Sequence, residues 1–138
     1  RSMTGGQMGI VAVLVAALAG FAMGAVWYMA LSKPWMKAAG IPTDEHGKPQ
    51  GSASPIPFAI SGLAMILVAG MMRHIFEMAA IVGPMEGLVS GLGIGAFFIT
   101  PWVAMNYGYA NRPKALTLLD GGYSILGPGV IGLVLGLF

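Results

Sequence analysis

The chain has 138 residues, of which 57% are hydrophobic and only 9% are charged, with a formal net charge of +2. Soluble domains carry about 25% charged residues, so this composition excludes an ordinary water-soluble protein. Seven cationic residues spread over several connectors form no patch that would bind nucleic acid. The absence of cysteine excludes disulfides and thiolate metal sites, and we expect neither a metal nor a cofactor.

The first nine residues are similar to a phage capsid leader that is used as an expression tag. We therefore interpret residues 1–9 as a tag remnant and residues 10–138 as one transmembrane domain.

Four long apolar stretches then follow, at residues 10–31, 56–72, 87–107 and 116–138. A bilayer core about 30 Å thick is crossed by about 20 apolar residues of helix. The sequence therefore predicts an all-α, integral membrane four-helix bundle.

The first span ends in Trp27 and Tyr28, and two lysines follow within ten residues. Aromatic rings favour the headgroup region and lysines extend beyond it, so this is a well-marked exit from the bilayer. Residues 38–55 are rich in proline and polar residues, and we expect an irregular exposed loop there. The second span can continue as a helix over residues 71–82, where Arg73 and Glu77 are four residues apart and lie on one helix face.

The third span begins at Glu86, an acidic residue that suits the positive end of a helix dipole. Pro101 removes a backbone hydrogen bond inside this span and predicts a kink. The fourth span contains Gly127, Pro128 and Gly129, so we expect a kinked or broken helix there.

The native cations predict the orientation of the bundle. With four crossings, the first and third connectors share one side of the membrane. That side holds Lys33, Lys37, Lys48, Arg112 and Lys114, and the other side holds Arg73 alone outside the suspected tag. The positive-inside rule then places these connectors in the cytoplasm and both termini outside, as in a bacterial inner membrane.

Small residues recur every fourth position, as in a glycine zipper. Such stripes allow close helix contact in membranes. The contact can lie inside the monomer, or between subunits of a homo-oligomer or of a larger membrane complex. The candidate helix-packing residues are Gly20, Gly24, Gly83, Gly87, Gly91, Gly95, Gly132 and Gly136.

Asp120 is the charge whose placement most needs an explanation. One interpretation makes it the N-cap of the fourth helix, where its side chain accepts hydrogen bonds from exposed backbone N–H groups. The other pairs it with Arg112, Lys33 or Tyr28 in a polar cluster that binds an ion, a proton or a headgroup.

Most aromatic and amide side chains fall on the predicted cytoplasmic side. They form either a one-sided interfacial belt or a polar-aromatic pocket where helix ends converge. The candidate site residues are Asp120, Tyr123, Arg112, Asn106, Asn111, Tyr28 and Trp27.

No catalytic constellation is visible, and His46 and His74 fall on opposite predicted sides of the bilayer, so we expect no enzyme and no histidine metal site. Two functions remain open. The first is transport of a small solute or an ion through the cytoplasmic-side site. The alternative is a non-catalytic accessory or structural subunit of a membrane complex that packs through its glycine stripes.

Several short motifs carry a resemblance to a known family. They are Gly24–Tyr28, Lys33-Pro34-Trp35, Asn106, Arg112 and Asp120-Gly-Gly-Tyr123. With them the chain resembles a family of small uncharacterised bacterial four-span membrane proteins, a domain of unknown function, over residues 9–138. The resemblance implies a four-helix integral membrane fold, and it supplies no reaction, substrate or catalytic residue.

Overall fold

The structure is a computed structural model that describes residues 5–42, 45–46 and 55–138. Every regular element in this part of the chain is helical. The elements are α1 (Gly5–Ala30), α2 (Ser32–Ala39), α3 (Ile56–Met78), α4 (Pro84–Ile94), the π-helical turn η1 (Gly95–Ile99), α5 (Thr100–Tyr109) and α6 (Lys114–Gly136).

The four predicted spans are confirmed as long apolar helices. The segments that are long and apolar enough to cross a membrane are Met8–Ala30, Ile56–Met78, Pro84–Tyr109 and Lys114–Gly136. The third of these joins α4, η1 and α5 into one continuous helical segment. The expected continuation of the second span is also present, because α3 extends to Met78.

The first connector begins with a helix that the sequence reading missed. Helix α2 extends the chain past the first span, with Met36 and Ala38 buried and Lys33 and Lys37 exposed. It ends at Gly40, whose φ of 71° is in the left-handed region that favours glycine. The predicted loop over residues 38–55 therefore starts two residues late, and much of it lies outside the described residues.

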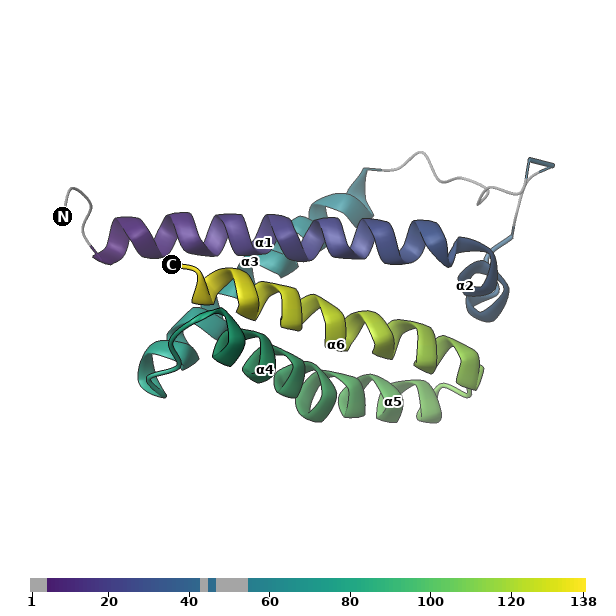
Figure 1. Ribbon diagram of the computed structural model, residues 1–138. Coiled ribbons are helices and arrows are strands. Elements are labelled where there is room, and N and C mark those ends of the chain that lie inside the picture. Colours follow the sequence, from purple (N-terminus) through teal and green to yellow (C-terminus); the bar gives the residue numbers. More distant parts are fainter. Residues whose placement is uncertain (1–4, 43–44, 47–54) are drawn as a thin grey trace.

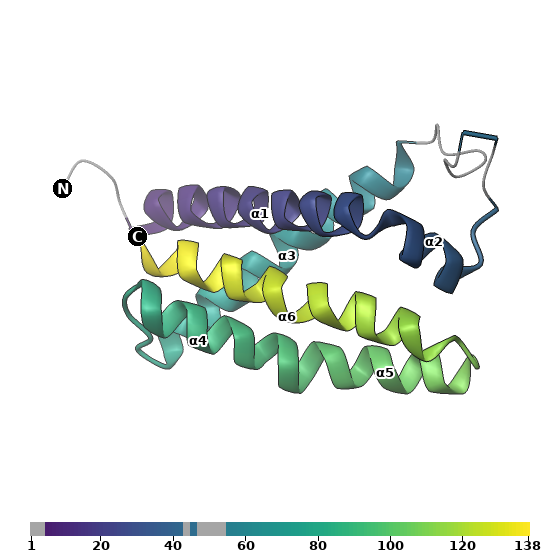
Figure 2. The ribbon, with the colours of Figure 1, turned by 45° about the vertical axis from the view of Figure 1, so that its right-hand side comes forward.

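Helix α6 is the centre of the bundle (Figures 1 and 2). In both views it lies between α1 and the α4–α5 segment, while α3 crosses obliquely behind. The most apolar window of α6 has 39% of its residues buried, against 11% for that of α3. The start of α1 and the end of α6 lie at the same end of the bundle (Figure 1), so consecutive spans alternate in direction.

Glycine lets α4 and α6 touch backbone to backbone. A Cβ on Gly87 would overlap the Gly132 carbonyl group, and a Cβ on Gly132 would overlap the Gly87 carbonyl group. The same relation joins Gly91 to the Pro128 carbonyl and Gly136 to the Gly83 carbonyl. The Cα–H groups therefore point at carbonyl oxygens across the interface, a weak hydrogen bond that is common between closely packed helices.

The same interface accommodates Pro128 within a continuous α6. Proline has no N–H, so Pro128 leaves the Ser124 carbonyl, one turn earlier, without its usual helical donor. That carbonyl lies against Gly95, where any Cβ would overlap it. Neighbouring helices commonly satisfy backbone groups that a proline releases in this way. The expectation of a broken helix is therefore wrong, since α6 continues from Lys114 to Gly136.

The expected kinks at Pro101 and Pro128 stay predictions. Around Pro101 the structure adds a feature that the sequence did not reveal, the π-helical turn η1. It ends where the Thr100 N–H donates to the Gly95 carbonyl, five residues earlier. Pro101 follows directly, in the first turn of α5. Because α5 continues the preceding helical segment and proline has no N–H, Pro101 donates no hydrogen bond to that segment.

Small side chains also form the seam between α1, α3 and α6. The buried core of this seam is Ala12, Ala16, Ala17, Ala69, Met72, Phe76, Ile131 and Leu135. Four of these eight residues are alanines, and their small side chains keep the helix axes close. The side chain of Ile131 is fully buried in this seam.

The α4–α6 contact generates a matched pair of substitutions on one helix. Gly91→Ala places a methyl group on the Pro128 carbonyl, whereas Gly93→Ala meets nothing within 4 Å. We expect Gly91→Ala to lower the free energy of unfolding by about 1–3 kcal/mol, the usual cost of overpacking. Gly93→Ala should leave it unchanged or raise it slightly. Denaturant titration in mixed micelles measures both, and equal effects of the two substitutions would contradict this packing.

Candidate functional site

The end of the bundle that holds the first and third connectors contains a polar cluster, which we define as Trp27, Tyr28, Tyr107, Asp120 and Tyr123. At its centre the Tyr28 hydroxyl donates to Asp120 Oδ1 at 2.6 Å, and the Tyr107 hydroxyl donates to Asp120 Oδ2 at 2.5 Å. Residues from α1 and α5 thus converge on one carboxylate of α6.

Asp120 lies inside α6, and the N-cap interpretation is wrong. The helix begins at Lys114 and its N-cap residue is Pro113, with no side-chain cap. Asp120 is about 9 Å further along the helix axis at 1.5 Å per residue. Among the described residues no cationic side chain forms an ion pair with it. Its carboxylate therefore depends on two neutral hydroxyl groups.

The two glycines after Asp120 make room for neighbouring side chains. A Cβ on Gly122 would overlap the Trp27 ring, and a Cβ on Gly121 would lie 3.1 Å from Thr100 Cγ2. The close fit lets Trp27 Nε1 donate to the Leu119 carbonyl at 2.9 Å. Thr100, directly after η1, donates to the Gly121 carbonyl at 3.3 Å. The Asp-Gly-Gly-Tyr motif thus has a steric explanation.

The Tyr123 side chain of α6 likewise occupies a space that a glycine of α1 leaves open. A Cβ on Gly24 would lie 2.8 Å from the Tyr123 hydroxyl oxygen, so glycine is required for this contact. The hydroxyl donates to the Gly20 carbonyl at 2.9 Å and lies 3.4 Å from Met65 Sδ of α3. The Tyr28 ring packs edge-on against Tyr123, with ring centres 5.5 Å apart. It packs in the same way against Trp35 of α2, at 5.9 Å.

Three predicted site residues lie outside this cluster. Arg112 donates through Nη2 to the Ala39 carbonyl at 2.6 Å, which joins the third connector to the end of α2. Asn111 has a φ of 55°, a left-handed conformation that asparagine tolerates better than most residues. Asn106 is exposed, and its side chain has no hydrogen-bond partner in the described part of the chain.

Two contributing residues were missed by sequence reasoning. Tyr107 was expected on this side of the membrane but was not assigned to the site, although it is one of the two donors to Asp120. Its place directly after Asn106, a predicted site residue, was the sequence signal that could have assigned Tyr107 to the site. Thr100 gave no signal, because its contact with Gly121 depends on the π-helical turn.

At the opposite end, two expectations about charge are confirmed. Glu86 lies in the first turn of α4 and accepts a hydrogen bond from the Val82 N–H at 2.9 Å. Arg73 and Glu77 form an ion pair at 2.8 Å, as their spacing predicts. Among the residues that the structure describes, no group of three His, Asp or Glu side chains could hold a metal ion.

The hydroxyl contacts to Asp120 generate a second matched pair. Tyr107→Phe removes one donor to the carboxylate, whereas Tyr109→Phe, two residues on, changes a side chain that is 86% exposed. We expect Tyr107→Phe to lower the free energy of unfolding by about 1 kcal/mol, a typical value for an interhelical hydrogen bond in a membrane. Tyr109→Phe should have almost no effect. Unfolding titrations in mixed micelles compare the two, and an unaffected Tyr107→Phe variant would contradict the assigned contact.

Comparisons with known proteins give a family for the chain. No curated protein and no solved structure matches it. One family model does match, with the description "Protein of unknown function (DUF1761)", and it spans residues 11–136. That range contains nearly all of the four apolar helical segments and every residue of the polar cluster. The resemblance to an uncharacterised family is therefore confirmed, and the chain belongs to the DUF1761 family of proteins of unknown function.

Proposed function

We propose that this protein is an integral membrane transporter of a small cation, with the proton included, and that Asp120 is the group that binds the transported ion. The observation that carries the proposal is the set of contacts made by the Asp120 carboxylate. Its two carboxylate oxygens accept hydrogen bonds from Tyr28 and Tyr107, and no described cation pairs with it.

A charge inside a membrane is energetically costly. An aspartate at the centre of a spanning helix costs roughly 2.5–3.5 kcal/mol on insertion scales, and the cost falls toward the ends of the helix, so Asp120, about 9 Å from the start of α6, incurs part of it. Two hydroxyl donors offset part of this cost but leave the negative charge without a counter-charge. A mobile cation or a proton supplies the missing positive charge, and intramembrane carboxylates commonly mark such pathways.

The described arrangement corresponds, in this proposal, to a closed state of the site. Tyr28 comes from α1 and Tyr107 from α5, and together they engage both oxygens of Asp120. Each oxygen keeps a lone pair that can contact a cation, and displacement of a hydroxyl, for fuller coordination of the ion, requires α1 or α5 to move relative to α6. The π-helical turn η1, directly before α5, is a position where such a movement can be absorbed, because π-helical turns often occur at functional sites.

The proposed orientation puts the polar cluster at the cytoplasmic side. Five native cations belong to the connectors at that end, namely Lys33, Lys37, Lys48, Arg112 and Lys114. The other end holds Arg73 outside the suspected tag. The positive-inside rule then predicts external termini and, in a bacterium, location in the inner membrane.

A second candidate is the accessory or structural subunit, alone or as a homo-oligomer. One observation favours it: several helical glycines have open space around them. A Cβ on Gly62 of α3, Gly93 of α4 or Gly108 of α5 would meet nothing within 4 Å. Glycine on an outward helix surface allows another helix to approach closely. In this alternative, substitutions at these glycines would disrupt assembly, while Asp120→Asn would have little effect.

Ion flux into proteoliposomes tests the transport proposal. The purified protein is reconstituted, and H⁺, Na⁺ and K⁺ fluxes are measured for the wild type, Asp120→Asn and Glu86→Gln. Glu86→Gln is the matched control, since it removes a carboxylate that is exposed at the other end of the bundle. We expect Asp120→Asn to abolish the flux and Glu86→Gln to retain it.

Two outcomes would contradict the proposal. One is a flux that Asp120→Asn leaves intact, and the other is a wild-type protein that transports none of these ions. Mass measurement of the complex in mild detergent, performed on the same preparation, reports whether a partner or a second copy copurifies and so addresses the alternative.

A further inference from the structure

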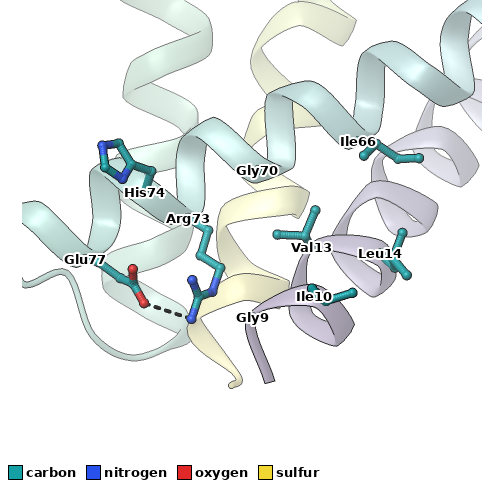
Figure 3. Close-up of a pocket in the computed structure, with 9 residues that line it drawn as sticks. All are labelled: Gly9, Ile10, Val13, Leu14, Ile66, Gly70, Arg73, His74 and Glu77. Atoms are coloured by element: carbon teal, nitrogen blue, oxygen red, sulfur yellow. Dashed lines mark ion pairs between the residues drawn. The ribbon is translucent and has the colours of Figure 1, made fainter. Parts of the chain in front are cut away.

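A groove of about 380 Å³ lies between α1 and α3, at the end of the bundle opposite the polar cluster. Its walls are apolar along most of its length. Those walls are Ile10, Val13 and Leu14 from α1, and Ile66 and Gly70 from α3. Figure 3 shows that the charged lining residues Arg73 and Glu77 lie together near Gly9, at the other end of the groove from Ile66.

Two glycines shape the groove. Gly70 leaves its α3 wall low, since even a Cβ there would reach only Val13 Cγ1, at 4.0 Å. Gly9 lies under the Arg73 guanidinium group, whose Cζ is 2.5 Å from the position of a Cβ. Gly9 belongs to the suspected tag remnant, and the other residues that line the groove all lie within residues 10–77.

The charged end offers both signs of charge to an outside molecule. Arg73 Nη2 and Glu77 Oε1 are 2.8 Å apart, and their side chains are 29% and 58% exposed. Both groups are therefore accessible while they remain paired. Arg73 lies about 8 Å from the end of α3 at 1.5 Å per residue, a depth that corresponds to the headgroup region if α3 spans the bilayer.

We propose that this groove binds a phospholipid whose headgroup carries both a phosphate and a primary ammonium. The acyl chain lies along the apolar walls, where Ile10, Leu14 and Ile66 are 64%, 50% and 40% exposed. The headgroup lies at the Arg73–Glu77 pair. This site is independent of Asp120, so it can be correct even if the transport proposal fails.

Charge complementarity selects the headgroup. A guanidinium fork matches the geometry of a phosphate group, and a carboxylate accepts hydrogen bonds from a primary ammonium. A headgroup that carries both a phosphate and an ammonium can therefore pair with Arg73 through the phosphate and with Glu77 through the ammonium. A quaternary ammonium has no N–H to donate, and a purely anionic headgroup brings no cation to Glu77.

Native mass spectrometry tests the proposal on the full chain in mild detergent. Phosphatidylethanolamine, phosphatidylcholine and phosphatidylglycerol with identical acyl chains are titrated in turn. We expect phosphatidylethanolamine to bind about tenfold more tightly than either of the others, because it alone completes both charge-assisted contacts. Arg73→Gln should weaken binding of all three lipids. Glu77→Gln should remove the preference for phosphatidylethanolamine over phosphatidylglycerol.

Matched controls separate a site from general adhesion of lipid. Lys37→Gln and Glu86→Gln remove an exposed cation and an exposed carboxylate outside the groove, and both should bind lipid as the wild type does. Gly70→Leu fills the groove without changing any charge, and it should weaken binding of all three lipids while the thermal unfolding temperature is retained. Equal affinity of the wild type for the three headgroups would overturn the proposal. Wild-type binding by both Arg73→Gln and Gly70→Leu would overturn it as well.

Discussion

The contact between the backbones of α4 and α6 is the constraint on which the other features depend. Glycine recurs every fourth residue on α4, and Gly132 and Gly136 continue the contact on α6, so carbonyl groups of each helix lie where side chains would otherwise be. In a bilayer the surrounding lipid is as apolar as the helices, so close packing rather than burial from water holds them together. This packing draws α6 into the centre of the bundle, with α1 on its other side (Figure 2).

The polar cluster follows from the central position of α6. Because α1 and α5 both pack on α6, Tyr28 and Tyr107 can reach the same carboxylate. Glycine again supplies the space, since the Trp27 ring lies over Gly122 and the Tyr123 ring lies over Gly24. Every polar side-chain atom that is fully buried in the described part of the chain has a hydrogen-bond partner. A membrane imposes this condition, because lipid offers no donors or acceptors to replace missing ones.

Local sequence patterns predicted the features that depend on residues close together in the chain. Hydropathy located the four spans, and residue spacing predicted the Arg73–Glu77 ion pair. Features that depend on where helices begin, or on how they are rotated and packed against one another, could not be predicted from local sequence patterns. The N-cap assignment of Asp120 failed because the helix starts six residues earlier, after Pro113. Helix α2 was missed because it has only eight residues and includes Pro34, although its amphipathic pattern is the strongest among the described α-helices. The selection of Tyr107 rather than Arg112 as a partner of Asp120 required the rotation of α5 about its axis, which no sequence pattern specified.

We propose that the Asp120 carboxylate, held by two hydroxyl groups, binds the transported cation. The chain contains just two aspartates, Asp44 and Asp120. Labelling aspartate with ¹³C at Cγ therefore gives two signals, and the Asp120→Asn variant assigns them. The NMR spectrum of the protein in lipid bilayers should show an Asp120 signal that moves when the cation is added. An Asp120 signal that stays fixed when the cation is added would contradict the account.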